Sequence, residues 1–312
     1  MKKVAAIALS LILSSSGSVL LAQDESEFAP RGLEAQSEGQ LPFGKREALA
    51  PIESGNPVVL VPKLMGIRLV GSVDTSGVEL KLPGFSVEGR IEAVGLTVGL
   101  GGLAKVLAPF LGAPLTESSL DRLIEAVLRY YESEDRPVTD IVVPDQDLTE
   151  GTIEVVVVDG VVGSTGMQTG GIFNDDLLSG AIHLQRGEIL LSSELQRHLD
   201  WFNRNPFRPA ALYAAPGKNQ GEADLVFALS ERRPWRVYSG YENSGAEVSG
   251  EHRFLTGFNW GDAFGSDVLL SYQFTSAESP EELSAHAVSL EIPLHSRHQF
   301  MRLSGSWADI AT

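Results

Sequence analysis

The sequence predicts two α+β domains followed by the first strands of an antiparallel transmembrane β-barrel. Between residues 57 and 232, short β-prone runs alternate with amphipathic helical runs. After Pro234 the apolar residues recur with a period of two, which is the period of a strand. These later segments are about nine to eleven residues long, the length of a tilted strand that crosses a bilayer.

An export signal is expected at residues 1–22. Lys2 and Lys3 precede an apolar run, and small residues then lead to Ala22, after which we expect cleavage. The alternative is a membrane-anchoring helix, but residues 14–18 interrupt the run before the roughly 20 apolar residues that a helical span needs. Residues 23–56 have scattered Glu, Ser, Pro and Gly without apolar periodicity, which predicts a flexible acidic linker.

Residues 57–164 are predicted to form the first α+β domain. Strands are expected at 58–61, 64–70, 91–98, 140–143 and 152–158, with turn residues at 144–151. Thr116 is expected to cap a helix that ends before Pro137. The apolar residues of that helix share one face, which should pack on the sheet: Leu120, Leu123, Ile124, Val127, Leu128 and Tyr131.

Residues 165–232 are predicted to form a second, shorter domain that repeats the first in outline. Helices are expected at 175–182 and 193–203, and strands at 211–214 and 224–229. Asn205, Pro206 and Phe207 should end the second helix sharply, because proline cannot continue it.

Residues 233–312 are predicted to be the N-terminal part of a β-barrel, with about five strands. The apolar and aromatic side chains should share one face, and tight joints at 261–265 and 295–298 alternate with longer ones at 243–251 and 276–282. A water-facing antiparallel sheet would also alternate. Aromatic residues near strand ends favour the membrane: Trp235, Trp260 and Phe274.

Composition excludes several other classes. The chain has no cysteine, so disulfides cannot hold its domains together. A net charge of -17 disfavours nucleic acid as a partner. The histidine pair His295 and His298 lies in an expected turn without nearby carboxylate or thiolate ligands, so no metal site is predicted.

No catalytic or cofactor-binding residue is predicted either. Gly99, Gly101 and Ala104 match a dinucleotide-binding fingerprint, but Pro109 would break the required helix and no βαβ series follows. A glycine-rich strand end leading into a short helix explains these residues better. The chain is therefore not expected to be an enzyme and no cofactor is expected.

Four stretches together resemble a known family. PVTDIVVPDQDLTEGTIEVVVVDGVVG (137–163) and LAPFLGAPLTESSLDRLIEAVLRYY (107–131) resemble the first polypeptide-transport-associated (POTRA) domain of two-partner secretion transporters, the ShlB/FhaC/HecB haemolysin secretion/activation family. HLQRGEILLSSELQRHLDWFNRNPFR (183–208) resembles the second POTRA domain. Residues 221–267 resemble its last strand and the entry into the barrel. The resemblance covers roughly residues 58–312.

The resemblance implies an outer-membrane transporter with periplasmic POTRA domains and a pore formed by a transmembrane β-barrel, as in type V secretion. It would recognise an unfolded haemolysin- or adhesin-type exoprotein and export it. The implied partners are an extended client and outer-membrane lipid, with a monomeric transporter. A client strand would add to a POTRA sheet edge. Five strands cannot close a barrel, so a C-terminally truncated sequence is expected.

Residues are carried over from the family as follows. Client contact is predicted for apolar side chains of the first domain's helix and last strand: Leu123, Val127, Tyr131, Val155 and Val157. Structural roles in turns and in the helix stop are predicted for Pro144, Gln146, Gly151, Asn205, Pro206 and Phe207. Residues 73–89 are expected to be an insertion between the first strands.

Two alternatives remain. One is an assembly factor that inserts other barrels into the outer membrane and also carries POTRA domains. The other, from a different class, is a soluble exported β-rich binding protein or adhesin, in which residues 235–312 form a water-facing sheet.

Overall fold

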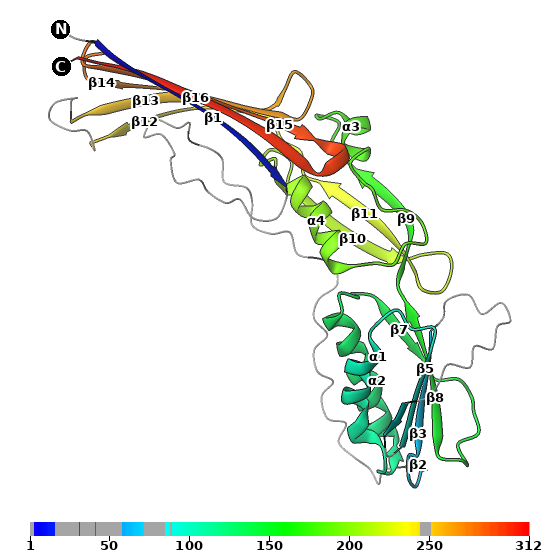
Figure 1. Ribbon diagram of the computed structural model, residues 1–312. Helices are drawn as coiled ribbons and strands as arrows, with labels where there is room; N and C mark the ends of the chain where they lie inside the picture. The colour runs from blue at the N-terminus through cyan, green and yellow to red at the C-terminus, as the bar shows by residue number, and fades with distance from the viewer. Residues whose placement is uncertain are drawn as a thin grey trace.

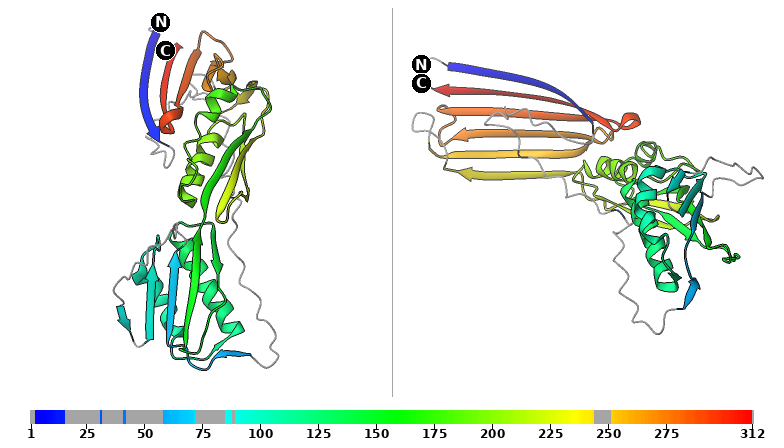
Figure 2. Two further views of the ribbon diagram at one scale, coloured as in Figure 1. Left: turned by 90° about the vertical axis from the view of Figure 1, so that its right-hand side faces the viewer. Right: turned by 60° about the horizontal axis from the view of Figure 1, so that its bottom comes forward.

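The computed structural model contains two α+β domains and a long antiparallel sheet, which follow one another along the molecule (Figures 1 and 2). The structure describes residues 3–15, 31, 41, 58–71, 85–87, 89–243 and 251–311. Within these residues, no helix is long and apolar enough to span a membrane.

The first domain is a five-stranded sheet with helices on one face (Figure 1). Its sheet has the order β4-β5-β3-β8-β7, and the central strand β3 runs parallel to both neighbours. The elements are β2 (Val59–Val61), β3 (Gly66–Gly71), β4 (Phe85–Val87), β5 (Gly89–Val94), α1 (Leu100–Leu107), a short 3-10 turn (Ala108–Phe110), β6 (Leu115–Thr116), α2 (Glu117–Ser133), β7 (Thr139–Val142) and β8 (Thr152–Asp159).

Helix α2 forms as the sequence predicts. The Thr116 side chain accepts a hydrogen bond from the Ser119 backbone N–H, and the Ser119 side chain accepts one from the Thr116 N–H in return. This reciprocal capping box satisfies two otherwise unpaired backbone donors. Of the expected apolar face of α2, four residues pack into the domain core with α1 and β8: Leu120, Leu123, Val127 and Tyr131. Ile124 and Leu128 lie outside this cluster.

The second domain is smaller, and its residues 161–229, all of which the structure describes, have no strands that correspond to β2, β4, β5 and β6. It contains β9 (Val161–Gln168), α3 (Asp175–Ser179), α4 (Ser192–Asn203), β10 (Ala210–Pro216) and β11 (Glu222–Leu229). The sheet order is β10-β11-β9, with β11 antiparallel to β10 and parallel to β9. In each domain two helices lie between the first strand and the final antiparallel pair, so one folding pattern occurs twice.

The predicted strands after Pro234 are present and form one antiparallel sheet with the order β1-β16-β15-β14-β13-β12. They are β12 (Trp235–Glu242), β13 (Arg253–Ala263), β14 (Val268–Ala277), β15 (Leu283–Leu294) and β16 (Gln299–Ala311). The register confirms the predicted apolar face, because Val237 lies opposite Phe258, Phe258 opposite Tyr272, and Tyr272 opposite Val288. Directly opposed residues lie on the same face of a sheet.

Residues of the predicted export signal form β1 (Lys3–Ser15), which pairs antiparallel with β16. This pairing fills the sheet edge that β16 would otherwise present. Cleavage after Ala22 stays a prediction, and Ala22 lies outside the described residues, as does most of the predicted linker.

The structure differs from the expected elements at three places. Strand β9 (Val161–Gln168) is not among the expected strands, because Gly163, Ser164 and Gly166 lower its strand propensity. Helix α3 stops at Ser179 instead of 182, before Gly180. Strand β5 ends at Val94 because Gly95 turns the chain with a φ of 68°.

The predicted insertion at 73–89 lies mostly outside the described residues. Its described part is β4 and the start of β5, which pair antiparallel with each other.

Candidate functional site

The five residues predicted to contact a client are core residues. The side chains of Leu123, Val127, Tyr131, Val155 and Val157 are all 0% exposed, in one apolar cluster between helix and sheet. A fully buried side chain offers no surface to a partner, so this assignment is corrected to core packing. The apolar periodicity that suggested these residues reports burial and does not distinguish a groove from a core.

The turn residues of the first domain have structural roles that the geometry explains. The Gln146 side chain donates to the Glu154 carbonyl (2.8 Å) and accepts from the Glu154 N–H (2.6 Å), which fixes the loop against β8. It also donates to the Pro144 carbonyl (3.1 Å). Gly151 has a φ of 72°, and a Cβ there would lie 2.9 Å from the Lys63 carbonyl oxygen. Glycine fits this position because it has no Cβ.

Residues 205–207 join the second domain to the long sheet. The Asn205 side chain donates to the Gly261 carbonyl and to the Asp267 carboxylate, both at 2.7 Å, across the tight joint between β13 and β14. Phe207 is buried against Gly261, where a Cβ would come within 2.2 Å of the ring. The predicted helix stop, in which Pro206 follows Asn205, is therefore also a contact between domains.

A buried charge cluster lies at the same place, at the C-terminal end of α4. Arg208 makes a two-pronged ion pair with Asp267, at 3.0 and 2.6 Å, and Arg204 lies 2.9 Å from the same carboxylate. Arg204 also contacts Glu291 of β15 at 2.5 Å, and Arg302 of β16 contacts the other Glu291 oxygen at 2.8 Å. We call these five residues the joint cluster.

The joint cluster holds Asp267 ionised. Burial by itself raises the pKa of the Asp267 carboxyl, but the guanidinium groups of Arg208 and Arg204 outweigh it, so the pKa is lowered. Sequence reasoning missed Asp267, because nothing near it in sequence reveals a partner that lies 59 residues away.

The N-terminal end of α4 is held by the first domain. Its own cap residue, Leu191, makes no side-chain cap hydrogen bond. Instead the Asp135 carboxylate accepts from the Ser193 N–H at 2.9 Å and from the Ser193 hydroxyl, and the Asp135 carbonyl accepts from the Ser192 N–H. Both ends of α4 are therefore fixed by groups outside the second domain.

Strands β8 and β9 are separated only by Gly160, so one extended run of chain belongs to both α+β domains (Figure 1). Gly160 donates to the Val138 carbonyl at 2.9 Å, and its own carbonyl accepts from Leu190 at 2.9 Å. A Cβ on Gly160 would lie 2.5 Å from the Val138 Cβ. The shared strand and these bonds fix how the second domain follows the first.

Strand β3 of the first domain and strand β9 of the second domain are each paired on the side that faces away from the final antiparallel pair. In the first domain β5 pairs with β3, and in the second a loop pairs with the start of β9 through Val162 and residues 187–189. At the other end of each sheet, the edge strand is β7 in the first domain and β10 in the second. In the described part of the chain no further strand pairs with either of them. Strand β10 is the longer, and its Tyr213 side chain is 60% exposed beside Val226.

The polar face of the long sheet binds a residue of the predicted linker. The Arg31 backbone N–H donates to Tyr238 and Gln273, and its carbonyl accepts from Arg236 and Asn259, at 3.0 to 3.3 Å. The Arg31 guanidinium forms an ion pair with Glu242. The polar face therefore bonds both main-chain groups of Arg31 through side chains.

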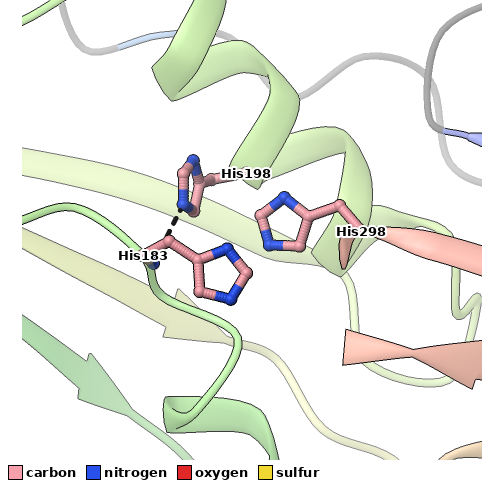
Figure 3. A group of neighbouring side chains, drawn as sticks. All are labelled: His183, His198 and His298. Atoms are coloured by element: carbon pink, nitrogen blue, oxygen red, sulfur yellow. Dashed lines mark hydrogen bonds between the residues drawn. The ribbon is translucent and has the colours of Figure 1, made fainter. Parts of the chain in front are cut away.

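Three histidines meet, as Figure 3 shows. The Trp201 ring, which stacks on His298, also lies under the Arg204 guanidinium of the joint cluster. His183 follows α3, His198 lies on α4, and His298 ends the turn between β15 and β16, with their ligand-capable nitrogens within 4.8 Å of one another. The sequence expectation of no metal site considered His298 with His295, its neighbour in sequence. The structure brings His298 to two histidines from the second domain instead.

Comparison with known proteins is consistent with this architecture. The family model for the ShlB-type POTRA domain matches residues 90–160. The heme/hemopexin transporter protein HuxB of Haemophilus influenzae is 25% identical over 179 residues, which are 55% of this chain and 32% of HuxB. The outer membrane transporter CdiB-2 of Burkholderia pseudomallei is 24% identical over 149 residues, 46% of this chain and 24% of the relative. The chain thus spans a third or less of their length.

Solved structures share the fold. CdiB from Escherichia coli superimposes on 88% of this chain and 46% of its own, with a TM-score of 0.59 at 15% identity. CdiB from Acinetobacter baumannii matches 83% of this chain and 46% of its own, with a TM-score of 0.51 at 16% identity.

Proposed function

We propose that this chain, which carries a ShlB-type POTRA domain and is a relative of two-partner secretion transporters, is the periplasmic and first-strand part of such a transporter in the outer membrane. The POTRA domains receive an unfolded exoprotein of the haemolysin or adhesin type in the periplasm. The β-barrel that β12 to β16 begin then carries it to the cell surface. No catalytic step and no cofactor are part of this function.

The observation that carries the proposal is the arrangement of the joints in the long sheet. The two tight joints, 264–267 and 295–298, contact the second POTRA domain, the first through the hydrogen bond from Asn205 to Asp267 and the second through that from His298 to the Ala181 carbonyl. The longer joints lie at the other end of the strands. Short turns on the periplasmic side and longer loops on the outer side are typical of outer-membrane barrels.

The apolar face of the sheet supports contact with lipid. Its side chains remain exposed, including Val237 at 70%, Trp235 at 55% and Tyr241 at 55%. A monomeric soluble protein rarely exposes so large a contiguous apolar surface. This disfavours the soluble adhesin alternative, and the ShlB-type domain favours the transporter over the barrel-assembly factor.

The client is proposed to bind as an added strand at β10 of the second POTRA domain. Strand addition needs a free edge whose main chain can pair with an extended peptide. Strand β10 has seven residues and β7 only four, so β10 provides the longer edge. The exposed Tyr213 ring beside it offers apolar contact to a client side chain.

Site-specific crosslinking in cells tests the proposal. The 312 residues contain no cysteine, so a single Tyr213→Cys change places one thiol on β10 in this part of the protein. The full-length transporter would be produced with the exoprotein encoded beside its gene, bearing one cysteine in its N-terminal export region. We expect a disulfide-linked pair and secretion of the exoprotein into the medium.

Arg197→Cys is the matched control, because Arg197 is exposed on α4 rather than at the sheet edge. Equal crosslinking at both positions would contradict binding at β10. Unchanged secretion after deletion of the transporter gene would contradict the proposed function itself.

A further inference from the structure

We propose that His183, His198 and His298 form a zinc site that links the second POTRA domain to the β15–β16 turn of the long sheet. The three side chains come from three separate segments of chain (Figure 3). Three imidazoles with a water molecule as fourth ligand form a common zinc coordination sphere. Neutral imidazole also suits other late first-row ions, such as cobalt and nickel.

The rings of His198 and His298 are already held in place by backbone carbonyls. The Nδ1 atom of His198 lies 2.8 Å from the Glu194 carbonyl oxygen, and the Nε2 atom of His298 lies 2.7 Å from the Ala181 carbonyl oxygen. A ring nitrogen that donates to a carbonyl fixes the tautomer and places the lone pair on the other nitrogen. The expected ligand atoms are therefore Nε2 of His198 and Nδ1 of His298.

Two of the three rings lie in buried, aromatic surroundings. His198 and His298 are 0% and 3% exposed, and the Trp201 ring stacks on His298 at 5.3 Å.

His183 is the ligand that an ion entering from solvent would meet first. This residue is exposed, so an ion can reach the cluster from solvent past its ring. Its backbone N–H makes a long 3.2 Å hydrogen bond to Nε2 of His198, which the ion would replace. The nitrogens lie within 4.8 Å of one another, and the His183 ring stacks on His298 at 4.6 Å, so binding one ion through all three would require the His183 side chain to rotate.

The site would fix the angle between two parts of the molecule. His183 and His198 belong to the second POTRA domain, whereas His298 precedes β16 directly. The neighbouring joint cluster already connects α4 with β15 and the β13–β14 turn. A zinc ion would reinforce the connection to the turn between β15 and β16 that the His298–Ala181 hydrogen bond already makes.

Metal binding to the folded chain in detergent tests the inference. The protein would be made without a polyhistidine tag and titrated with ZnCl₂ against a chromophoric chelator, and with CoCl₂ for its visible spectrum. We expect one ion per chain and an intense cobalt spectrum typical of four-coordinate nitrogen and oxygen ligation. Absence of stoichiometric binding at micromolar zinc would overturn the proposal.

His183→Ala is the informative variant, because an exposed side chain can be removed without unfolding the core. Zinc affinity should fall by more than about 100-fold, since loss of even an outer-shell partner costs about 10- to 100-fold. His252→Ala, at a histidine that contacts Tyr241 far from the cluster, should bind as the parent chain does. Equal affinities of the His183→Ala variant and the parent would assign the ion to another site and overturn the proposal.

Hydrogen exchange supplies a second measurement. Zinc should slow exchange at residues 181–183 and 295–299 together, because the ion connects both segments. Protection of only one segment would contradict the link between the domain and the sheet.

Discussion

The two α+β domains both place two helices before a final antiparallel strand pair but differ in how their long helices are held. Helix α2 of the first domain has its own capping box at Thr116 and Ser119 and packs into a core of its own domain. Helix α4 of the second domain is capped by Asp135 of the first domain, and its other end is paired with Asp267 of the sheet. The first domain is thus self-contained, whereas the second is positioned by both neighbours.

The difference indicates how the first domain is positioned relative to the long sheet. A helix fixed at both ends by other parts of the chain relates the first domain to the sheet through a single rigid element. The second domain is therefore suited to present the β10 edge at a defined distance from the tight turns. Substitutions that release one end of α4 should weaken the connection between the first domain and the sheet. Substitutions in α2 should affect the first domain alone.

The largest effect is expected for Asp267→Ala. This change leaves the fully buried Arg208 without its carboxylate partner, and removing one partner of a buried pair costs about 3–5 kcal/mol. Urea unfolding of the chain in detergent would measure the loss. The control is Glu125→Ala, which breaks the exposed pair with Arg129 on α2 and should cost less than about 1 kcal/mol. Equal losses of unfolding free energy in the two variants would contradict the conclusion that α4 is held by its buried pairing with Asp267.

A smaller effect on the same pair is expected from acid. The folded pKa of Asp267 lies below its unfolded value of about 3.9, so its stabilisation is fully present above that pH and is lost as the pH falls through the folded pKa. Urea midpoints from about pH 6 down to 2 should therefore fall less steeply for Asp267→Asn than for the parent chain. Parallel curves would show that Asp267 does not contribute to acid sensitivity.

Asp135→Gly should loosen the N-terminal end of α4. Asp135 has a φ of 68°, which glycine adopts without strain, so the variant removes the cap and little else. Loss of a cap costs about 0.5–2 kcal/mol. Amide exchange of Ser193 should accelerate, whereas Ser192 keeps the Asp135 carbonyl as its acceptor and should change less. If α4 exchanged as before, the cap from the first domain would have no energetic role.

Thr116→Ala is the matched change in α2 and should have the most local effect. It removes the side-chain acceptor for the Ser119 N–H, at a cost of about 1 kcal/mol. We expect faster amide exchange in the first turn of α2 only. Faster exchange in α4 as well would show that the first domain is less independent than its contacts indicate.

The sequence determined the elements that depend on local patterns. The helix that begins after Thr116 follows from a cap residue and one apolar face, and the strands after Pro234 follow from strict alternation, which fixes the face of every residue. The turn roles of Gly151 and Asn205 could be assigned from glycine, asparagine and proline chemistry. Strand β9 was missed, since glycine and serine carry little strand propensity.

Tertiary structure alone decided the contacts between segments that are distant in sequence. The apolar periodicity around Leu123 and Val155 could not distinguish a core from a groove, because both bury apolar side chains periodically. Asp135 gives no sign in sequence that it caps a helix 58 residues away, and His298 is neighboured in sequence by His295 but in space by His183 and His198. Ion pairs, caps and ligand sets depend on distances of a few ångströms, which only the packing of the domains establishes.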